Sequence, residues 1–115
     1  MQIVERRLDS VTVLRLKGRL VYEDGFEDLR QALDRAVADS GNVVLNFDEV
    51  TYLDSAGVGL IAGKYATALR CGGKLKLSNL QRRSYRVLET TKLLTIFESF
   101  DTEADAVRSF GAQPC

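Results

Sequence analysis

The chain has 115 residues, of which 45% are hydrophobic and 28% are charged, and sixteen Lys and Arg residues balance sixteen Asp and Glu residues. This composition is typical of one ordinary globular domain. The charge balance argues against a nucleic-acid partner, because proteins that bind nucleic acids usually carry an excess of basic residues. There is no histidine, and Cys71 and Cys115 form no metal motif. We therefore expect no metal site, no cofactor, and no catalysis by a Ser-His or Cys-His pair.

The hydropathy pattern also limits the location of the protein. No apolar run approaches the roughly 18–20 residues of a membrane-spanning helix. The first residues lack the apolar segment of a signal peptide. The sequence therefore predicts a cytoplasmic protein with no membrane insertion.

The first part of the chain predicts a β-hairpin. Residues 3–8 and residues 11–17 have strand patterning, and the Asp9-Ser10 pair between them is a candidate two-residue turn. Gly18 is expected to end the second strand, and residues 18–24 are expected to form a loop.

The middle of the chain predicts two helices around a buried strand. Residues 25–39 repeat apolar side chains at helical spacing, and Ser40-Gly41 ends this helix. Residues 43–47 are an apolar run, which is typical of a strand covered by helices on both faces. A second helix is expected from about Ala56 to Arg70. Its expected core side carries Val58, Ile61, Tyr65 and Leu69.

The last part predicts four shorter elements. Residues 74–78 alternate polar and apolar side chains, as in a half-buried strand. A short helix is expected over residues 82–90 and a last strand over residues 95–100. A helix-start signature with capping-box spacing follows at residues 101–105, and residues 111–115 are expected to fray. The residues expected to face the core in this part are Val87, Leu88, Ala104, Val107 and Phe110.

Together these elements predict an α/β fold in one domain covering residues 1–115. The expected order is β-β-α-β-α-β-α-β-α. A hairpin followed by β-α-β crossovers requires a mixed sheet, here of four to five strands, packed with about four helices.

The junction between the third strand and the second helix is the most informative segment. Asp54 and Ser55 lie where a helix is expected to begin, so either of them can cap it. The same position displays a hydroxyl group, and helix N-termini accept negative charge. Gly57 and Gly59 follow; they permit either tight packing of the helix on the sheet or close approach of a partner's backbone.

Several motifs at fixed positions carry a family resemblance. They are Gly18, residues 43–46, the segment Tyr52-Leu53-Asp54-Ser55-Ala56-Gly57-Val58-Gly59-Leu60, residues 72–77, and the Val87-Leu88 helix before Leu93. With these motifs the chain resembles STAS domains, named for sulfate transporters and anti-sigma factor antagonists, over nearly its whole length.

The resemblance implies a partner-switching regulator of the antagonist type. In that branch the serine that maps onto Ser55 is phosphorylated by an anti-sigma factor, which is also a serine kinase with a histidine-kinase-like ATPase fold. The unphosphorylated form binds the kinase, phosphorylation releases it, and a serine phosphatase resets the switch. The partner-binding residues that the resemblance implies are Asp24, Asp54, Ser55, Ala56, Gly57, Val58 and Gly59.

Other functions remain as alternatives. Some small STAS proteins are accessory subunits of lipid-transport ABC ATPases, which would use the same surface without phosphorylation. An enzyme is not expected, because the sequence has no P-loop, no nucleophile elbow and no paired-carboxylate arrangement. The cluster Arg82, Arg83 and Arg86 is either a solvated helix face or a contact for an acidic partner or nucleotide.

Overall fold

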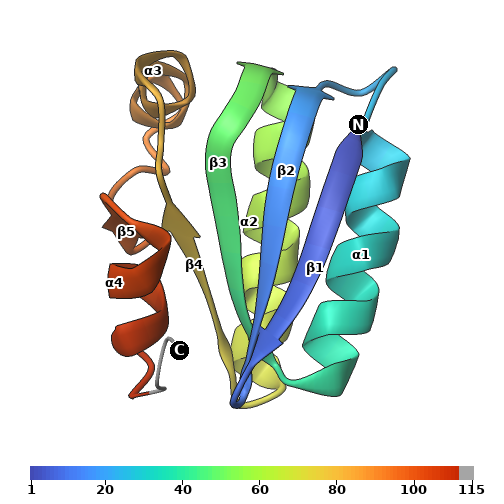
Figure 1. Ribbon diagram of the computed structural model, residues 1–115. Helices are drawn as coiled ribbons and strands as arrows, with labels where there is room; N and C mark the ends of the chain where they lie inside the picture. The colour runs from blue at the N-terminus through green and yellow to red at the C-terminus, as the bar shows by residue number, and fades with distance from the viewer. Residues whose placement is uncertain (112–115) are drawn as a thin grey trace.

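The computed structural model describes residues 1–111 and shows a five-stranded mixed sheet packed with four helices in that range (Figure 1). The predicted element order is confirmed. Residues 112–115, for which fraying is predicted together with Gly111, lie outside the described residues. The elements are β1 (Gln2–Leu8), β2 (Val11–Leu20), α1 (Phe26–Asp39), β3 (Asn42–Leu53), α2 (Ser55–Arg70), β4 (Lys74–Ser78), α3 (Arg82–Thr90), β5 (Ser99–Phe100) and α4 (Glu103–Arg108).

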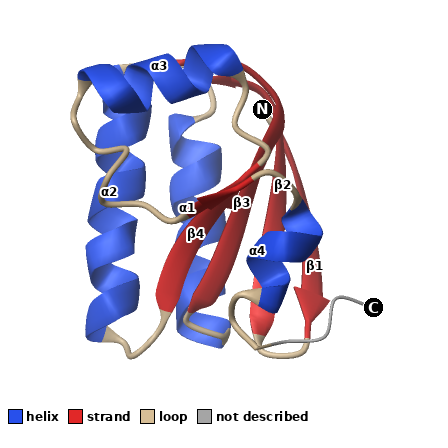
Figure 2. Ribbon diagram, turned by 90° about the vertical axis from the view of Figure 1, so that its left-hand side faces the viewer, coloured by secondary structure: helices blue, strands red, loops and turns tan. Residues whose placement is uncertain are grey.

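The strands lie in the sheet in the same order as in the chain. β1 and β2 form the predicted antiparallel hairpin, in which Leu8 pairs with Val11 and Asp9 has a positive φ of 55°. Each later neighbour pair is parallel. Figure 2 shows α1 and α2 side by side on one face of the sheet and α4 on the opposite face, while α3 lies across one end.

The sheet is therefore buried on two sides, and each side has its own core. The larger core lies between the sheet and helices α1 and α2, and includes Leu14, Leu45 and Phe47. A smaller one lies under α4, where Val44 packs with Val107. Adjacent residues of β3 thus point into different cores, which confirms the two-sided burial predicted from its apolar run.

The two central strands are longer than predicted. Gly18 does not end β2, which continues to Leu20 with a register shift between Gly18 and Arg19 against β3. Gly18 has φ of 118°, so the glycine permits an irregularity within the strand instead of a break. β3 likewise extends to Leu53, because its residues after Phe47 pair with the extended end of β2.

The C-terminal part also differs from the prediction. β5 contains only two residues, Ser99 and Phe100, because turns occupy most of the segment before it. Phe97 in that segment is buried, and its ring meets the Tyr65 ring edge-on at 5.3 Å between centroids. β4 is buried on both faces from Leu75 onward, so the prediction of a half-buried strand is wrong.

Two residues predicted to face the core, one in α2 and one in α4, lie on the exposed side of their helix. Ala68, not Leu69, continues the buried side of α2, since Leu69 lies about 100° further round the helix and is 45% exposed. In α4 the buried pair is Ala106 and Val107, and Ala104 is exposed. No helix within residues 1–111 is long and apolar enough to cross a membrane.

Candidate functional site

The candidate site lies at the end of the sheet where β3 passes into α2. The backbone N–H of Asp54 donates to the carbonyl oxygen of Leu20 at 3.3 Å, so the pairing of β2 with β3 continues to the last residue before the helix. α2 begins at the next residue, Ser55. The first turn of a helix therefore stands at the carboxyl end of a parallel strand, where α/β proteins commonly place their functional groups.

Asp54, not Ser55, caps the helix. Asp54 has an extended backbone, and its Oδ1 accepts a hydrogen bond from the N–H of Gly57 at 2.9 Å. Its Oδ2 accepts a second bond, from the N–H of Tyr22 in the loop between β2 and α1, at 3.1 Å. One carboxylate thus holds together the end of β3, the start of α2 and a neighbouring loop.

Ser55 therefore does not cap the helix. Its side chain is exposed, and its hydroxyl makes no hydrogen bond within residues 1–111. Ala56 beside it is partly exposed. The fold therefore presents a single hydroxyl group at the first residue of α2.

The two glycines of the motif have different surroundings. A Cβ on Gly57 would lie 2.9 Å from the carbonyl oxygen of Leu20 and 2.9 Å from Cδ1 of Leu53, so this glycine permits tight packing of helix on sheet. A Cβ on Gly59 would meet nothing within 4 Å, and the residue is exposed. Val58 between them is buried. Gly59, not Gly57, thus leaves open surface on the first turns of α2.

The structure brings Asp24 to the same end of the sheet. Val21 and Asp24 exchange backbone hydrogen bonds of 2.9 and 3.1 Å, which close the tight turn that contains Tyr22. Asp24 is exposed, and its Oδ1 lies 3.8 Å from the terminal ammonium group of Met1. Since Tyr22 bonds to Asp54, this turn is a direct neighbour of the α2 start.

Arg83 of the predicted arginine cluster lies beside this junction, where it meets Tyr52 and Arg19, two residues that the sequence does not connect with it. The Tyr52 ring is 48% exposed, and two guanidinium carbons lie over it, Arg19 Cζ at 5.9 Å and Arg83 Cζ at 6.0 Å from the centroid. Arg83 also donates to the carbonyl oxygen of Thr51 at 3.4 Å. The signal in the sequence is the alternation of Tyr52 with the buried Leu53, which turns the tyrosine outward.

A second polar feature lies on the α4 side of the sheet and is structural. Arg15 donates two hydrogen bonds to Glu103, at 2.9 and 3.0 Å, and Asn46 donates a third at 3.0 Å, at the edge of a hollow of about 320 Å³. These donors hold the pKa of Glu103 below its usual range. The network ties α4 to β2 and β3. Within residues 1–111 no cluster of side chains has the makeup of a metal site.

Comparison with known proteins identifies relatives over nearly the whole chain. A curated relative, the anti-sigma F factor antagonist of Paenibacillus polymyxa, is 26% identical over 109 residues, which cover 93% of this chain and 92% of the relative. An anti-sigma factor antagonist from Mycobacterium paratuberculosis has a similar structure, with a TM-score of 0.84 at 23% identity, covering 94% of this chain and 92% of that one.

The antagonist SpoIIAA has the same fold. Its unphosphorylated form matches with a TM-score of 0.80 at 24% identity, covering 96% of this chain and 97% of that one. A structure of phosphorylated SpoIIAA from Bacillus matches with a TM-score of 0.75 at 22% identity, covering 95% and 99%. The model of the STAS domain matches residues 2–106, which include every strand and the whole Asp54–Gly59 segment. This chain therefore belongs to the STAS domain family.

Proposed function

We propose that this protein is an anti-sigma factor antagonist that works by partner switching, with Ser55 as its phosphoacceptor. The observation that supports the proposal is the exposed Ser55 hydroxyl at the start of α2, next to an Asp54 that already caps the helix. Relatives support it too, since the P. polymyxa protein is an antagonist by name and SpoIIAA exists in a phosphorylated form.

Phosphorylation at this position is compatible with an unchanged fold. A phosphoryl group adds about −1.5 to −2 charge at pH 7 and several acceptor oxygens. It breaks no hydrogen bond of the Ser55 hydroxyl, and the helix N-terminus favours negative charge. The nearby Asp54 carboxylate opposes the added charge. The effect is therefore expected at the surface of a docked partner, where a desolvated contact does not accept a new charge.

The partners in this proposal are those of the antagonist branch. An anti-sigma factor that is a serine kinase with a histidine-kinase-like ATPase fold binds the unphosphorylated form. A serine phosphatase removes the phosphate, and the cycle takes place in the cytoplasm. The domain itself is a binding module, not an enzyme, and the contact residues at its surface are Asp24, Asp54, Ser55, Ala56 and Gly59. Gly57 and Val58, which the sequence also predicts as contacts, are buried and pack the helix on the sheet instead.

The test uses a purified serine kinase with a histidine-kinase-like ATPase fold from the same organism. Incubation with the kinase and ATP is expected to place one phosphate on Ser55, located by peptide mass spectrometry, and none on a Ser55→Ala protein. Ser55→Asp is expected to weaken the kinase complex by about tenfold or more. Ser10→Asp is the matched control, because it adds the same charge at an exposed position in the β1–β2 turn.

Two results would contradict the proposal. One is equal kinase affinity of Ser55→Asp and wild type. The other is an ABC ATPase that co-purifies equally with wild type and Ser55→Ala while no phosphorylated form exists in cells, which would identify an accessory subunit instead.

A further inference from the structure

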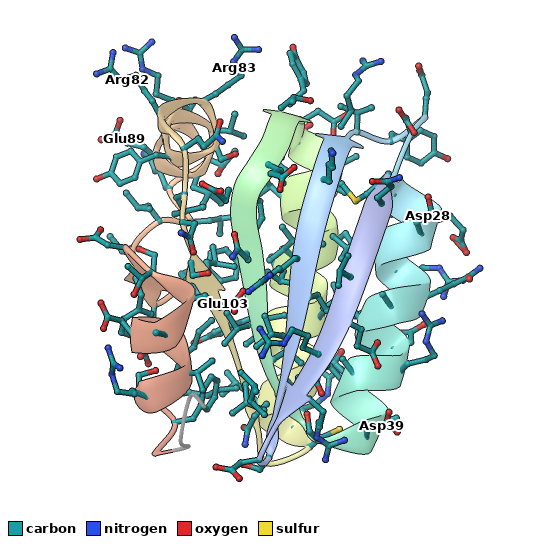
Figure 3. All side chains as sticks on the ribbon, viewed as in Figure 1. Asp28, Asp39, Arg82, Arg83, Glu89 and Glu103 are labelled. Atoms are coloured by element: carbon teal, nitrogen blue, oxygen red, sulfur yellow. The ribbon has the colours of Figure 1, made fainter. Side chains whose placement is uncertain are left out.

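The charges around the α2 start are divided into two sides. The acidic side consists of Glu23, Asp24 and Asp28, in the β2–α1 loop and the first turn of α1. The basic side consists of Arg19, Arg82, Arg83 and Arg86, at the end of β2 and on α3. Figure 3 shows Arg82 and Arg83 at one side of this end of the molecule and Asp28 at the other. The net charge of the chain is zero, so this division is local.

The α2 start lies between the two sides. Asp54 accepts the hydrogen bond from Tyr22, which belongs to the acidic loop. Tyr52, two residues earlier, contacts both Arg19 and Arg83. A partner that covers Ser55 therefore meets both kinds of charge.

The basic side is not neutralised within the protein. No ion pair within residues 1–111 involves any arginine of the basic side, a property that they share with Arg35 and Arg70. What distinguishes the basic side is its place beside the α2 start, where Arg19 and Arg83 contact the same Tyr52 ring. These four guanidinium groups are available to an outside carboxylate.

The charges of α3 oppose its helix dipole. Arg82 and Arg83 occupy the first turn, where the dipole is positive, and Glu89 lies in the last turn, where it is negative. The first turn has no acidic residue, and no side chain caps it. Each such charge destabilises the helix, most strongly at low ionic strength. An arrangement that weakens its own helix is expected where the residues serve a binding role.

The surroundings of the arginines also suit a partner. The Tyr52 ring contacts two guanidinium groups at 5.9 and 6.0 Å, which favours positions of both arginines beside the α2 start. Beside them lies a hollow of about 470 Å³, lined by Gln81, Arg82, Arg83, Arg86 and Val87. The surface thus has both charge and shape for an acidic segment.

We infer that the basic side receives an acidic surface of the protein partner that docks over Ser55, an inference that rests on the proposed function. The divided charge fixes the orientation of the partner, with its acidic residues over Arg83 and its basic residues over Asp24. A phosphate on Ser55 adds negative charge to the covered surface and so repels the carboxylates of the partner.

The test needs neither the kinase nor phosphorylation. The ¹⁵N-labelled protein is titrated with a Glu-rich peptide, with the same peptide carrying Gln for every Glu, and with a short DNA duplex. The Glu peptide is expected to shift the amide signals of Arg19, Tyr52 and Arg83, and the Gln peptide to shift none. Raising the salt from about 0.05 to about 0.3 M should weaken Glu-peptide binding by about fivefold or more.

Variants make the test specific. Arg83→Gln is expected to weaken binding of the Glu peptide by about threefold or more. Arg35→Gln, at an exposed arginine on α1 away from the basic side, should leave it unchanged. In the kinase complex the same pair of variants should show the same difference.

Three outcomes would overturn the inference. They are shifts confined to the acidic side, equal binding of the Glu and Gln peptides, and DNA binding tighter than that of the Glu peptide. If Ser55 is labelled but the Glu peptide does not bind the basic side, the switch stands and the inference fails. If the peptide binds there but Ser55 is never labelled, the proposed function fails instead.

Discussion

The Asp54 carboxylate accepts a hydrogen bond from the backbone N–H of Tyr22, 32 positions earlier in the chain, at 3.1 Å. Its other oxygen caps α2 through Gly57. The two hydrogen bonds of this one carboxylate therefore join the β2–α1 loop to the start of the helix beside Ser55.

Replacing Asp54 should therefore destabilise the fold. Asp54→Ala removes the helix cap and leaves the Tyr22 N–H without its acceptor, so we expect a loss of about 1–3 kcal/mol in the free energy of unfolding. Asp54→Asn keeps one acceptor oxygen and should lose less. Urea denaturation followed by circular dichroism measures both. A loss below about 0.5 kcal/mol for Asp54→Ala would show that the cap contributes little.

The two glycines of the motif offer a matched pair of substitutions. Gly57→Ala forces a methyl group against Leu20 and Leu53 and should cost about 1–3 kcal/mol. Gly59→Ala meets open space within a helix and should stabilise the protein by about 0.5–1 kcal/mol. Thermal melting of both proteins tests the difference. Equal melting temperatures of the two variants would mean that α2 shifts away from the sheet to fit the methyl group at position 57 without loss of stability.

The Arg15–Glu103 pair predicts a pH dependence. The hydrogen bond from Arg15 is the main cause of the lowered pKa of Glu103 in the folded protein, so the unfolded state takes up the proton first as the pH falls. The stabilisation is complete above the ordinary Glu pKa of about 4.3 and is lost as the pH drops through the lower folded value.

Glu103→Gln should remove this contribution. The difference in unfolding free energy between wild type and variant is expected to shrink between pH about 5 and pH about 3. Glu5→Gln is the control, because that exposed carboxylate on β1 forms no ion pair within residues 1–111. A wild-type advantage over Glu103→Gln that stays constant across this range would contradict the assignment.

The charges of α3, which oppose its helix dipole, predict that charge reversal stabilises the protein. Arg82→Glu places an acid at the positive end of the helix and should raise the unfolding free energy by about 0.3–1 kcal/mol. Arg86→Glu, one turn further along, should raise it less. Differential scanning calorimetry in low salt measures both. Destabilisation by Arg82→Glu would mean that Arg82 has a stabilising role that its contacts do not reveal.

The sequence predicts helices α1, α2 and α3 and strand β4 with nearly their observed bounds, because their patterns and stop signals are local. It predicts only the first half of β3, whose later residues are not an apolar run. The extended end of β2 depends instead on pairing with β3, so the positive φ of Gly18 permits an irregular strand where a turn is expected from the residue type. The two-residue β5 likewise owes its place to β4, not to its own pattern.

The candidate site shows the same limit. Position alone identifies Asp54 and Ser55 as cap candidates, and only the bonds to Gly57 and Tyr22 distinguish between them. The contact of Arg83 with Tyr52 joins residues from α3 and β3, and no spacing rule connects such distant positions.

Because the Asp54 side chain makes the hydrogen bonds that hold the start of α2, the side chain at position 55 makes none of them. A change of side chain there, whether by substitution or by chemical modification, alters the outer surface and leaves the folding free energy nearly untouched. The structural and the surface roles at this junction thus belong to different residues, since Asp54 holds the backbone and Ser55 contributes only to the surface.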